Sequence, residues 1–214
     1  MRSSCHSRSD DRPIHYADRA GAQVVSRKSA DERKASGLYL TPVAIADFMA
    51  AQARSGKSDM RILDPAAGSG TLLCAVVERM AYTGNRFRSA ELTAYEIDPD
   101  LHETLVAVMD NLKRWALRHR IRVTVTVEKK DFVLTHSHLL GLTRYLFDLL
   151  TSPAFDLVIA NPPYFKIPKC DLRARAATSV VHGQPNIYAL FMAAGAALLR
   201  EHGEFLFIVP RSFA

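Results

Sequence analysis

The segment from Phe155 to Ala160 constrains the fold more than any other part of the chain. It is a short run, apolar except for Asp156, and it ends at Asn161 and two consecutive prolines. Such a run is typical of a strand that is buried on both faces, as in the centre of a parallel sheet. Because parallel strands need long crossover connections, usually helices, the segment predicts an α/β fold.

The chain from Gly37 onward alternates between strand-like and helix-like segments. Besides residues 155–160, strand chemistry recurs at residues 61–63, 92–95, 121–127 and 205–209. Helical patterns occupy residues 43–49, 71–81, 99–118, 133–152 and 187–199, and Thr41-Pro42 is the predicted cap and first position of the first helix. The alternation predicts a doubly wound, mostly parallel, Rossmann-like sheet with helices on both faces. Ligands of such sheets bind beyond the carboxyl ends of the strands.

Composition narrows the class of protein. The chain has 214 residues, of which 48% are hydrophobic, enough for one domain with a core. Its three cysteines include no Cys-x-x-Cys pair, which argues against a disulfide framework or a zinc site and favours a reducing cytoplasm. No apolar run reaches the ~18 residues of a membrane span, so we expect no membrane association. The net charge of +6 suits a polyanionic partner without identifying it.

Residues 1–35 differ in composition from the rest of the chain. They mix Arg, Ser, Asp and His with few large apolar residues, and they show no sustained period. We expect a basic, flexible N-terminal tail here, with a basic arm that contacts DNA phosphates as the alternative. The catalytic domain is expected to occupy residues 36–214.

The first predicted strand is followed by a loop of small residues. The loop runs through Asp64, Pro65, Ala66, Gly68 and Gly70 into the next helix. Small residues let the backbone approach a ligand, and the helix N-terminus offers free N–H groups. The loop is neither a Gly-x-Gly-x-x-Gly sequence nor a P-loop, which disfavours a dinucleotide or a nucleoside triphosphate.

Acidic residues follow the next two predicted strands. Glu96 and Ile97 end one of them, and Glu96 is placed to accept hydrogen bonds from both hydroxyls of a ribose. Asp98 with Pro99 is a predicted helix cap. Asp131-Phe132 follows the third strand, where a carboxylate and an aromatic ring could hold an adenine; alone, this pair is also an ordinary turn.

The fourth strand ends in Asn161-Pro162-Pro163-Tyr164. Two prolines fix the backbone and remove two N–H donors, so that carbonyl groups are presented to a pocket. A purely structural loop has no need of this arrangement.

With these segments placed, residues 37–213 resemble the amino-methylating DNA methyltransferases, in particular the adenine-N6 enzymes of restriction–modification systems. The segments that carry the resemblance are Gly37-Leu38-Tyr39-Leu40-Thr41-Pro42, Asp64 to Gly70, Glu96-Ile97-Asp98, Asp131-Phe132, Asn161 to Tyr164, Asn186-Ile187-Tyr188 and Gly203 to Pro210. The resemblance implies the sheet of the class I S-adenosylmethionine-dependent methyltransferases. It also implies that the chain stops after the fifth strand, with the final strands and the target-recognition region absent.

The resemblance further implies S-adenosylmethionine as cofactor. Its ligands would be Thr41, Pro42, Asp64, Pro65, Ala66, Gly68, Gly70, Glu96, Ile97, Asp131 and Phe132. Asn161, Pro162, Pro163 and Tyr164 would be catalytic on a flipped-out adenine, the first two through oxygen atoms that accept the N6 hydrogens and Tyr164 by stacking. Thr41 would lie near the cofactor carboxylate, or cap its helix, or both. Double-stranded DNA is the implied substrate, and a cognate restriction endonuclease or a separate recognition subunit is a possible partner.

Four alternatives remain open from the sequence. Protein glutamine methyltransferases also use Asn-Pro-Pro-Tyr, although Thr41-Pro42 and the Asp-Pro-Ala-Ala form of the first loop argue against them. An RNA adenine methyltransferase and an inactive remnant are the second and third. Pro99-Asp100 with Glu128-Lys129-Lys130 loosely resembles the metal pattern of a nuclease, but no metal site is expected.

Overall fold

The protein forms a single parallel sheet in the computed structural model, which describes residues 12–54, 56–83, 86–140, 154–177 and 185–210. The five strands are β1 (Asp59–Asp64), β2 (Ser89–Tyr95), β3 (Arg122–Glu128), β4 (Phe155–Ala160) and β5 (Leu199–Phe207), in the order β3-β2-β1-β4-β5. Every neighbouring pair is parallel. β2 and then β3 lie on one side of β1, and β4 and then β5 lie on its other side. The switch in strand order therefore lies between β1 and β4, which confirms the doubly wound prediction.

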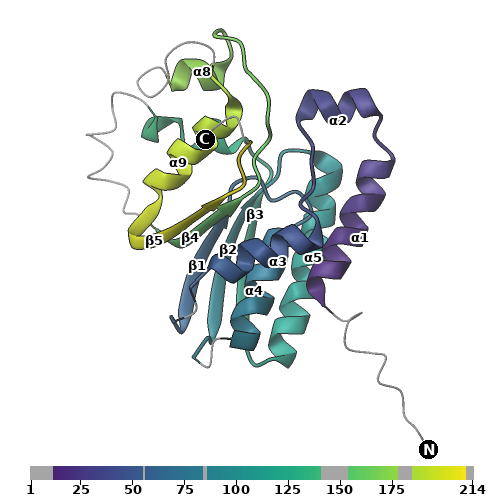
Figure 1. Cartoon of the computed structure of the whole chain (residues 1–214), viewed down its shortest axis with the longest axis vertical. Coiled ribbons are helices and arrows are strands. Elements are labelled where there is room, and N and C mark those ends of the chain that lie inside the picture. Colours follow the sequence, from purple (N-terminus) through teal and green to yellow (C-terminus); the bar gives the residue numbers. More distant parts are fainter. Residues whose placement is uncertain (1–11, 55, 84–85, 141–153, 178–184, 211–214) are drawn as a thin grey trace, which may run out of the picture.

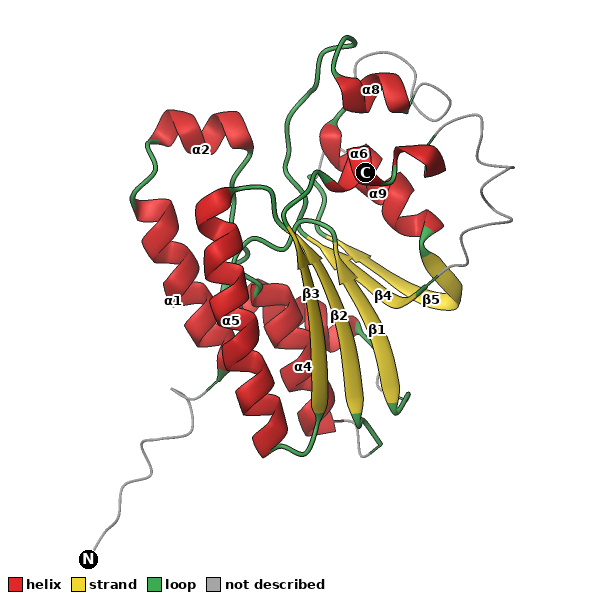
Figure 2. Cartoon of the chain, turned by 180° about the vertical axis from the view of Figure 1, so that it is seen from behind, coloured by secondary structure: helices red, strands yellow, loops and turns green. Residues whose placement is uncertain are grey.

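Helices cover both faces of the sheet (Figure 1, Figure 2). One face carries α1 (Pro13–Ser26), α3 (Val43–Gln52), α4 (Thr71–Thr83) and α5 (Pro99–Arg118). The other carries α6 (Phe132–Thr135), the short 3₁₀ helix η1 (Ser137–Leu139), α8 (Leu172–Ala176) and α9 (Ile187–Ala197). Adjacent residues of β1 point to opposite cores: Ile62 packs with the first set and Leu63 with the second. This alternation follows from the two-residue period of a strand.

The expectation of a flexible tail over residues 1–35 is wrong for the part that the structure describes. Residues from Pro13 onward form α1 and then α2 (Ala30–Ser36). Helix α1 buries Ile14, Ala17, Gly21 and Val24, which lie on one face of a helix, against α4 and α5. Two of these four residues, Ala17 and Gly21, have a small side chain or none, so the stripe is weak as a hydrophobic signal. The folded unit therefore begins before residue 36, and residues 1–11 lie outside the described residues.

Polar contacts fix the start of α1. The Arg12 guanidinium bonds to Glu78 of α4 and to Asp47 of α3, each at 2.6 Å. Glu78, whose side chain is 2% exposed, also accepts the backbone N–H of Ile14 at 2.7 Å. Ser29 and Glu32 form a reciprocal capping box at the start of α2. The Arg12 and Glu78 contacts thus tie α1 to the domain, and the capping box fixes the start of α2.

The other predicted elements need smaller corrections. Asp98 caps α5 as expected, since its side chain accepts the N–H groups of Asp100 and Leu101. Thr41 does not cap α3: Pro42 occupies the N-cap position, and no side chain caps this helix. β5 begins earlier and ends earlier than predicted. Of the helix predicted at residues 133–152, only α6 and η1 are described, and residues 141–153 lie outside the described part.

Candidate active site

The glycine-rich loop after β1 needs its two glycines. Gly68 and Gly70 have φ angles of +55° and +84°, a region that other residues rarely adopt. A Cβ at Gly70 would come within 2.7 Å of the Met109 side chain, and a Cβ at Gly68 would reach 3.0 Å from that of Leu40. The loop is thus packed between α5 and the segment that follows α2, and Ala66 and Gly68 are its partly exposed residues.

Two carboxylates hold this loop in place. Glu96 accepts the N–H of Gly68 at 2.9 Å and that of Asp98 at 2.8 Å, so it joins the ends of β1 and β2. Asp64 is fully buried, accepts the N–H of Ala66 at 3.0 Å and keeps its Oδ2 without a partner among the described residues. Burial raises the pKa of Asp64 to about 8, and burial also raises the pKa of Glu96. Of the two, only Glu96 lines the larger pocket, where a ligand that donates hydrogen bonds to it would favour its charged form.

An apolar wall follows β2 and β3. Ile97 is 61% exposed although it is a large aliphatic residue, and it lines the pocket. Phe132 is buried, and its ring packs against Tyr95 and Phe191 with centroid distances of 5.2 and 5.6 Å. Asp131 caps α6 through the N–H of Leu134, at 2.9 Å. Asp131 therefore has the structural role in a turn that the sequence left open. Its side chain also lines the larger of the two pockets described below.

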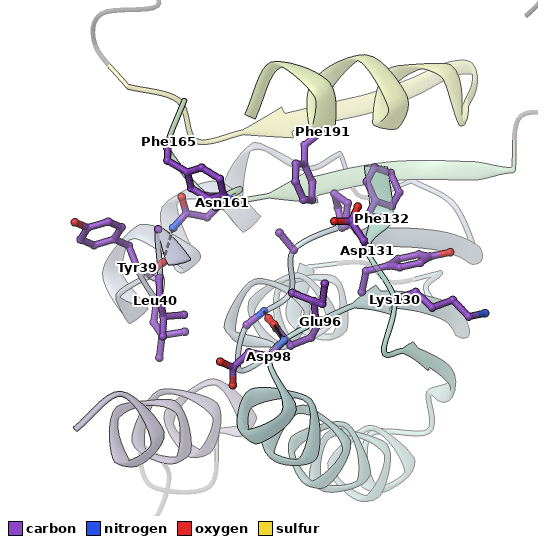
Figure 3. A pocket seen from close by; sticks show the side chains of 18 of the residues that line it. Tyr39, Leu40, Glu96, Asp98, Lys130, Asp131, Phe132, Asn161, Phe165 and Phe191 are labelled. Atoms are coloured by element: carbon purple, nitrogen blue, oxygen red, sulfur yellow. Dashed lines mark hydrogen bonds between the residues drawn. The ribbon is translucent and has the colours of Figure 1, made fainter. Parts of the chain in front are cut away.

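The loop after β4 is held by contacts from distant parts of the chain. The Asn161 amide nitrogen donates to the Tyr39 carbonyl at 3.2 Å (Figure 3). It also donates to Thr41 Oγ1 at 3.1 Å. The Tyr164 hydroxyl bonds to Asn161 Oδ1 and lies 2.8 Å from the Ile208 carbonyl oxygen. Burial raises the pKa of Tyr164 to about 12, so the phenol is protonated at neutral pH.

These groups surround two adjoining pockets at the carboxyl ends of the strands. The larger has about 830 Å³ of empty space and the smaller about 250 Å³. The predicted residues that line the larger one are Pro65, Ala66, Gly68, Glu96, Ile97, Asp131, Phe132, Asn161 and Pro163. Thr41 lines the smaller pocket, and Ala66, Gly68 and Asn161 line both. Asn161 therefore stands where the two pockets join.

Five predicted site residues lie behind the pocket walls. Among the described residues that line the two pockets, the set does not include Pro42, Asp64, Gly70, Pro162 or Tyr164. Asp64 accepts the N–H of Ala66, and Gly70 allows the loop to pack against Met109 of α5. The Tyr164 hydroxyl bonds to Asn161 Oδ1. These five residues therefore support the loops that line the pockets.

Several residues that line the larger pocket were not among the predicted site residues, although Tyr39 and Leu40 belong to the segment Gly37 to Pro42 that carries the resemblance. These are Tyr39, Leu40, Lys130, Phe165, Arg173 and Phe191, most of them visible in Figure 3. Arg173 forms ion pairs with Asp171 at 2.7 Å and with Asp131 at 3.6 Å. Phe165 directly follows the Asn-Pro-Pro-Tyr sequence, and Phe191 lies on α9, which begins with Asn186-Ile187-Tyr188, so both had a usable signal nearby. Arg173 lies on α8, in a segment without a local motif.

Asp156 has a role away from the pockets. It lies at the amino end of β4 and bonds to Lys57 at 2.7 Å, to the Arg61 N–H at 2.8 Å and to Arg200 at 3.2 Å. These partners lower the pKa of Asp156, so its charge is stabilised within the apolar strand.

None of the described helices is both long and apolar enough to cross a membrane.

Comparisons with known proteins agree on one kind of relative. A model of the Eco57I restriction-modification methylase family matches residues 92–214. The Type II methyltransferase M.PstI of Providencia stuartii is 29% identical over 181 residues, which cover 85% of this chain and 34% of that protein. The Type II methyltransferase M.BsuBI of Bacillus subtilis is 29% identical over 183 residues, covering 83% and 34%. The chain thus spans about a third of the length of these curated relatives.

Solved structures share the fold at low sequence identity. A Listeria monocytogenes protein assigned to the class I S-adenosylmethionine-dependent methyltransferases superposes with a TM-score of 0.63 at 18% identity, covering 99% of this chain and 57% of that one. The type IIG restriction endonuclease BpuSI gives a TM-score of 0.58 at 17% identity, covering 92% and 22%. The sheet and its helices are therefore those of the class I methyltransferase fold.

Proposed function

Because the chain belongs to the Eco57I restriction-modification methylase family, we propose that it is the catalytic part of an S-adenosylmethionine-dependent DNA methyltransferase that methylates N6 of adenine. The observation that carries the proposal is the place of Asn161, at the junction of two adjoining pockets. One end of this space has Glu96, Ile97 and Phe132, which suit a nucleoside. The other end has Thr41 and the glycine-rich loop, which suit the polar end of an amino acid.

The cofactor would extend along both pockets. Each carboxylate oxygen of Glu96 accepts one backbone N–H and has a further lone pair for a ribose hydroxyl. Ile97 and Phe132 would contact the two sides of the adenine, and Asp131 would lie at its edge. The backbone of Pro65, Ala66 and Gly68 would follow the methionine part. Asp64, Gly70 and Pro42 would act from behind, by holding the loop and the start of α3.

Asn161 and its neighbours would act on the target amino group. The bound cofactor would supply an electrophilic methyl group on a sulfonium. Asn161 Oδ1 and the Pro162 carbonyl would accept the two N6 hydrogens and favour a tetrahedral nitrogen whose lone pair faces that methyl. With N6 held in this way, its lone pair would take the methyl group, the sulfur would keep the electron pair of the C–S bond, and one N6 proton would pass to water. Pro163 keeps the loop rigid, and Tyr164 would stack on the flipped base.

The surface beside the site supports DNA as the substrate. Lys166, Lys169 and Arg175 are exposed on the segment that follows the Asn-Pro-Pro-Tyr sequence. None of the three pairs with a carboxylate in the part of the chain that the structure describes. Unpaired cations next to the pocket would neutralise phosphates on either side of a flipped base. We further propose a cytoplasmic enzyme that works with a cognate restriction endonuclease or a separate recognition subunit.

The test is methyl transfer with labelled S-adenosylmethionine to duplex DNA, followed by nucleoside analysis. N6-methyladenine is the expected product, and Asn161→Ala should abolish its formation while cofactor binding persists. N4-methylcytosine in place of N6-methyladenine would contradict the adenine assignment. Label on RNA or on a glutamine-containing protein, with none on DNA, would replace the DNA assignment.

A further inference from the structure

The Asn161 side chain has both of its N–H groups taken by one short segment. Its Nδ2 donates to the Tyr39 carbonyl and to Thr41 Oγ1, at 3.2 and 3.1 Å. A backbone carbonyl accepts and never donates, so the atom that faces Tyr39 must be the amide nitrogen. The contact therefore decides the orientation of the amide, which the shape of the side chain alone leaves open.

The opposite side of the amide is the acceptor side. Oδ1 faces the Tyr164 hydroxyl, which also lies 2.8 Å from the Ile208 carbonyl oxygen. A phenol has one proton, and Ile208 offers a second acceptor for it. When Tyr164 donates to Ile208, Oδ1 is free to accept a hydrogen from an incoming amino group.

The segment that holds Asn161 is itself fixed on two sides. Gly37 has a φ of +61°, and a Cβ there would lie 2.9 Å from Phe165 and 3.1 Å from Pro163. Leu40 packs between Gly21 of α1 and Gly68 of the glycine-rich loop. The segment thus connects the N-terminal helix, the glycine-rich loop and the catalytic loop.

We propose that Thr41 and the Tyr39 carbonyl orient the catalytic amide, so that Asn161 presents its oxygen, and not its NH₂ group, to the substrate amine. The inference rests on the proposed function and makes Thr41 a positioning residue. If the Asn161 amide were rotated by 180°, its NH₂ group would face the amino group of the target base. Two donors would then meet, and no hydrogen bond to the target could form. Thr41 accepts with a lone pair, and no described acceptor takes its hydroxyl proton. That proton remains available to an anionic group in the smaller pocket, which Thr41 lines.

The test compares Thr41→Val, which keeps the shape and removes the acceptor, with Thr41→Ser, which keeps the hydroxyl. The first measurement is the pair of ¹H–¹⁵N signals of the Asn161 side-chain amide, assigned by their loss in Asn161→Asp. In Thr41→Val one of the two proton signals should move upfield, and Thr41→Ser should keep it near the wild-type position. Thermal melting checks the fold, and Thr41→Ala replaces the valine variant if that variant is unfolded.

The second measurement is the single-turnover rate of methyl transfer at saturating cofactor and DNA. Loss of one neutral hydrogen bond should lower this rate roughly tenfold in Thr41→Val, with recovery in Thr41→Ser. An unchanged amide signal, with only the affinity for S-adenosylhomocysteine reduced, would overturn the proposal and leave Thr41 as a cofactor contact. A shifted amide signal in a chain that methylates no DNA would instead uphold the orientation and reject the proposed function.

Discussion

Gly21 of α1 lies directly against Ser69 of the glycine-rich loop. A Cβ at position 21 would come within 2.6 Å of Ser69 Oγ and 2.6 Å of the Leu40 side chain. Ser69 is buried and shares a hydrogen bond of 3.1 Å with Thr71, so it has little room to move. An N-terminal helix, predicted as a tail, is therefore part of the wall behind the site.

This contact predicts that Gly21→Ala is destabilising. In an exposed helix interior the same change would stabilise by ~1 kcal/mol, because alanine favours the helix. Here the overpacking should cost about 1–3 kcal/mol and should shift Ser69, so affinity for S-adenosylhomocysteine should also fall. Urea unfolding and calorimetry measure the two effects. Gly56→Ala is the matched control, since its Cβ meets nothing within 4 Å; equal stability of the two variants would contradict the packing argument.

Glu96→Ala should weaken cofactor binding strongly. The change removes an acceptor for the ribose and also the bonds that hold Gly68 and Asp98. Hydrogen bonds to a charged group contribute ~1.5–3 kcal/mol, so we expect the dissociation constant to rise roughly ten- to hundredfold. Calorimetry with S-adenosylhomocysteine gives the constant. Glu91→Ala, which removes only a surface pair with Arg61, should leave it unchanged; an unchanged constant in Glu96→Ala would remove Glu96 from the ribose role.

Asp64 should make the stability of the unliganded chain fall as the pH rises. The pKa of Asp64 is raised by burial from 3.8 to about 8, so between these values the folded chain holds a proton that the unfolded chain has lost. The unfolding free energy contributed by this group is highest below the unfolded pKa and is lost as the pH rises through the folded one.

Asp64→Asn removes this titration and keeps an acceptor for the Ala66 N–H. The variant should therefore gain stability relative to wild type between about pH 5 and about pH 8, by an amount of the order of a few kcal/mol. Thermal unfolding of both proteins across this range gives the difference. A constant difference at all pH values would show that Asp64 is not the titrating group.

Arg12 should stabilise the whole domain through α1. Glu78 is nearly fully buried, and without Arg12 its carboxylate would keep only the Ile14 N–H. Breaking a buried pair costs ~3–5 kcal/mol, and we expect about 3 kcal/mol for Arg12→Ala because Arg12 is partly exposed. Arg61→Ala, at a solvent-exposed pair with Glu91, should cost less than ~0.5 kcal/mol. Urea denaturation compares them, and similar midpoints would contradict the anchoring role.

The exposed cations beside the catalytic loop should contribute to DNA affinity without sequence preference. Each of Lys166→Ala, Lys169→Ala and Arg175→Ala should reduce the slope of log affinity against log salt by about 0.9 if the residue contacts one phosphate. Fluorescence anisotropy with duplexes of different sequence measures the slope. Lys113→Ala, on α5 where Lys113 pairs with Asp110, serves as the control. A salt dependence that matches wild type in all three would place the DNA elsewhere.

Local sequence was enough to predict the elements that end at the pocket. The apolar β4, the loop of small residues after β1 and the Asp98 cap of α5 each depend on interactions within a few residues. The doubly wound arrangement also followed, because crossover connections between parallel strands leave few topologies. The N-terminal helices could not be recognised by hydrophobicity, since α1 packs through Ala17 and Gly21, although the Ser29–Glu32 capping box was a usable signal for α2.

The sequence by itself determined the class I sheet, the loops at the ends of its strands and the residue types that these loops carry, because backbone geometry and burial patterns are encoded locally. Only the tertiary structure decided what those residues contact. Thr41 bonds to Asn161 across 120 residues of chain and does not cap its own helix, and Arg173 reaches the pocket from a helix without a motif. Such contacts depend on how distant segments pack. Thr41 could have capped α3 or bonded to Asn161, and the packing brings Asn161 within hydrogen-bond distance.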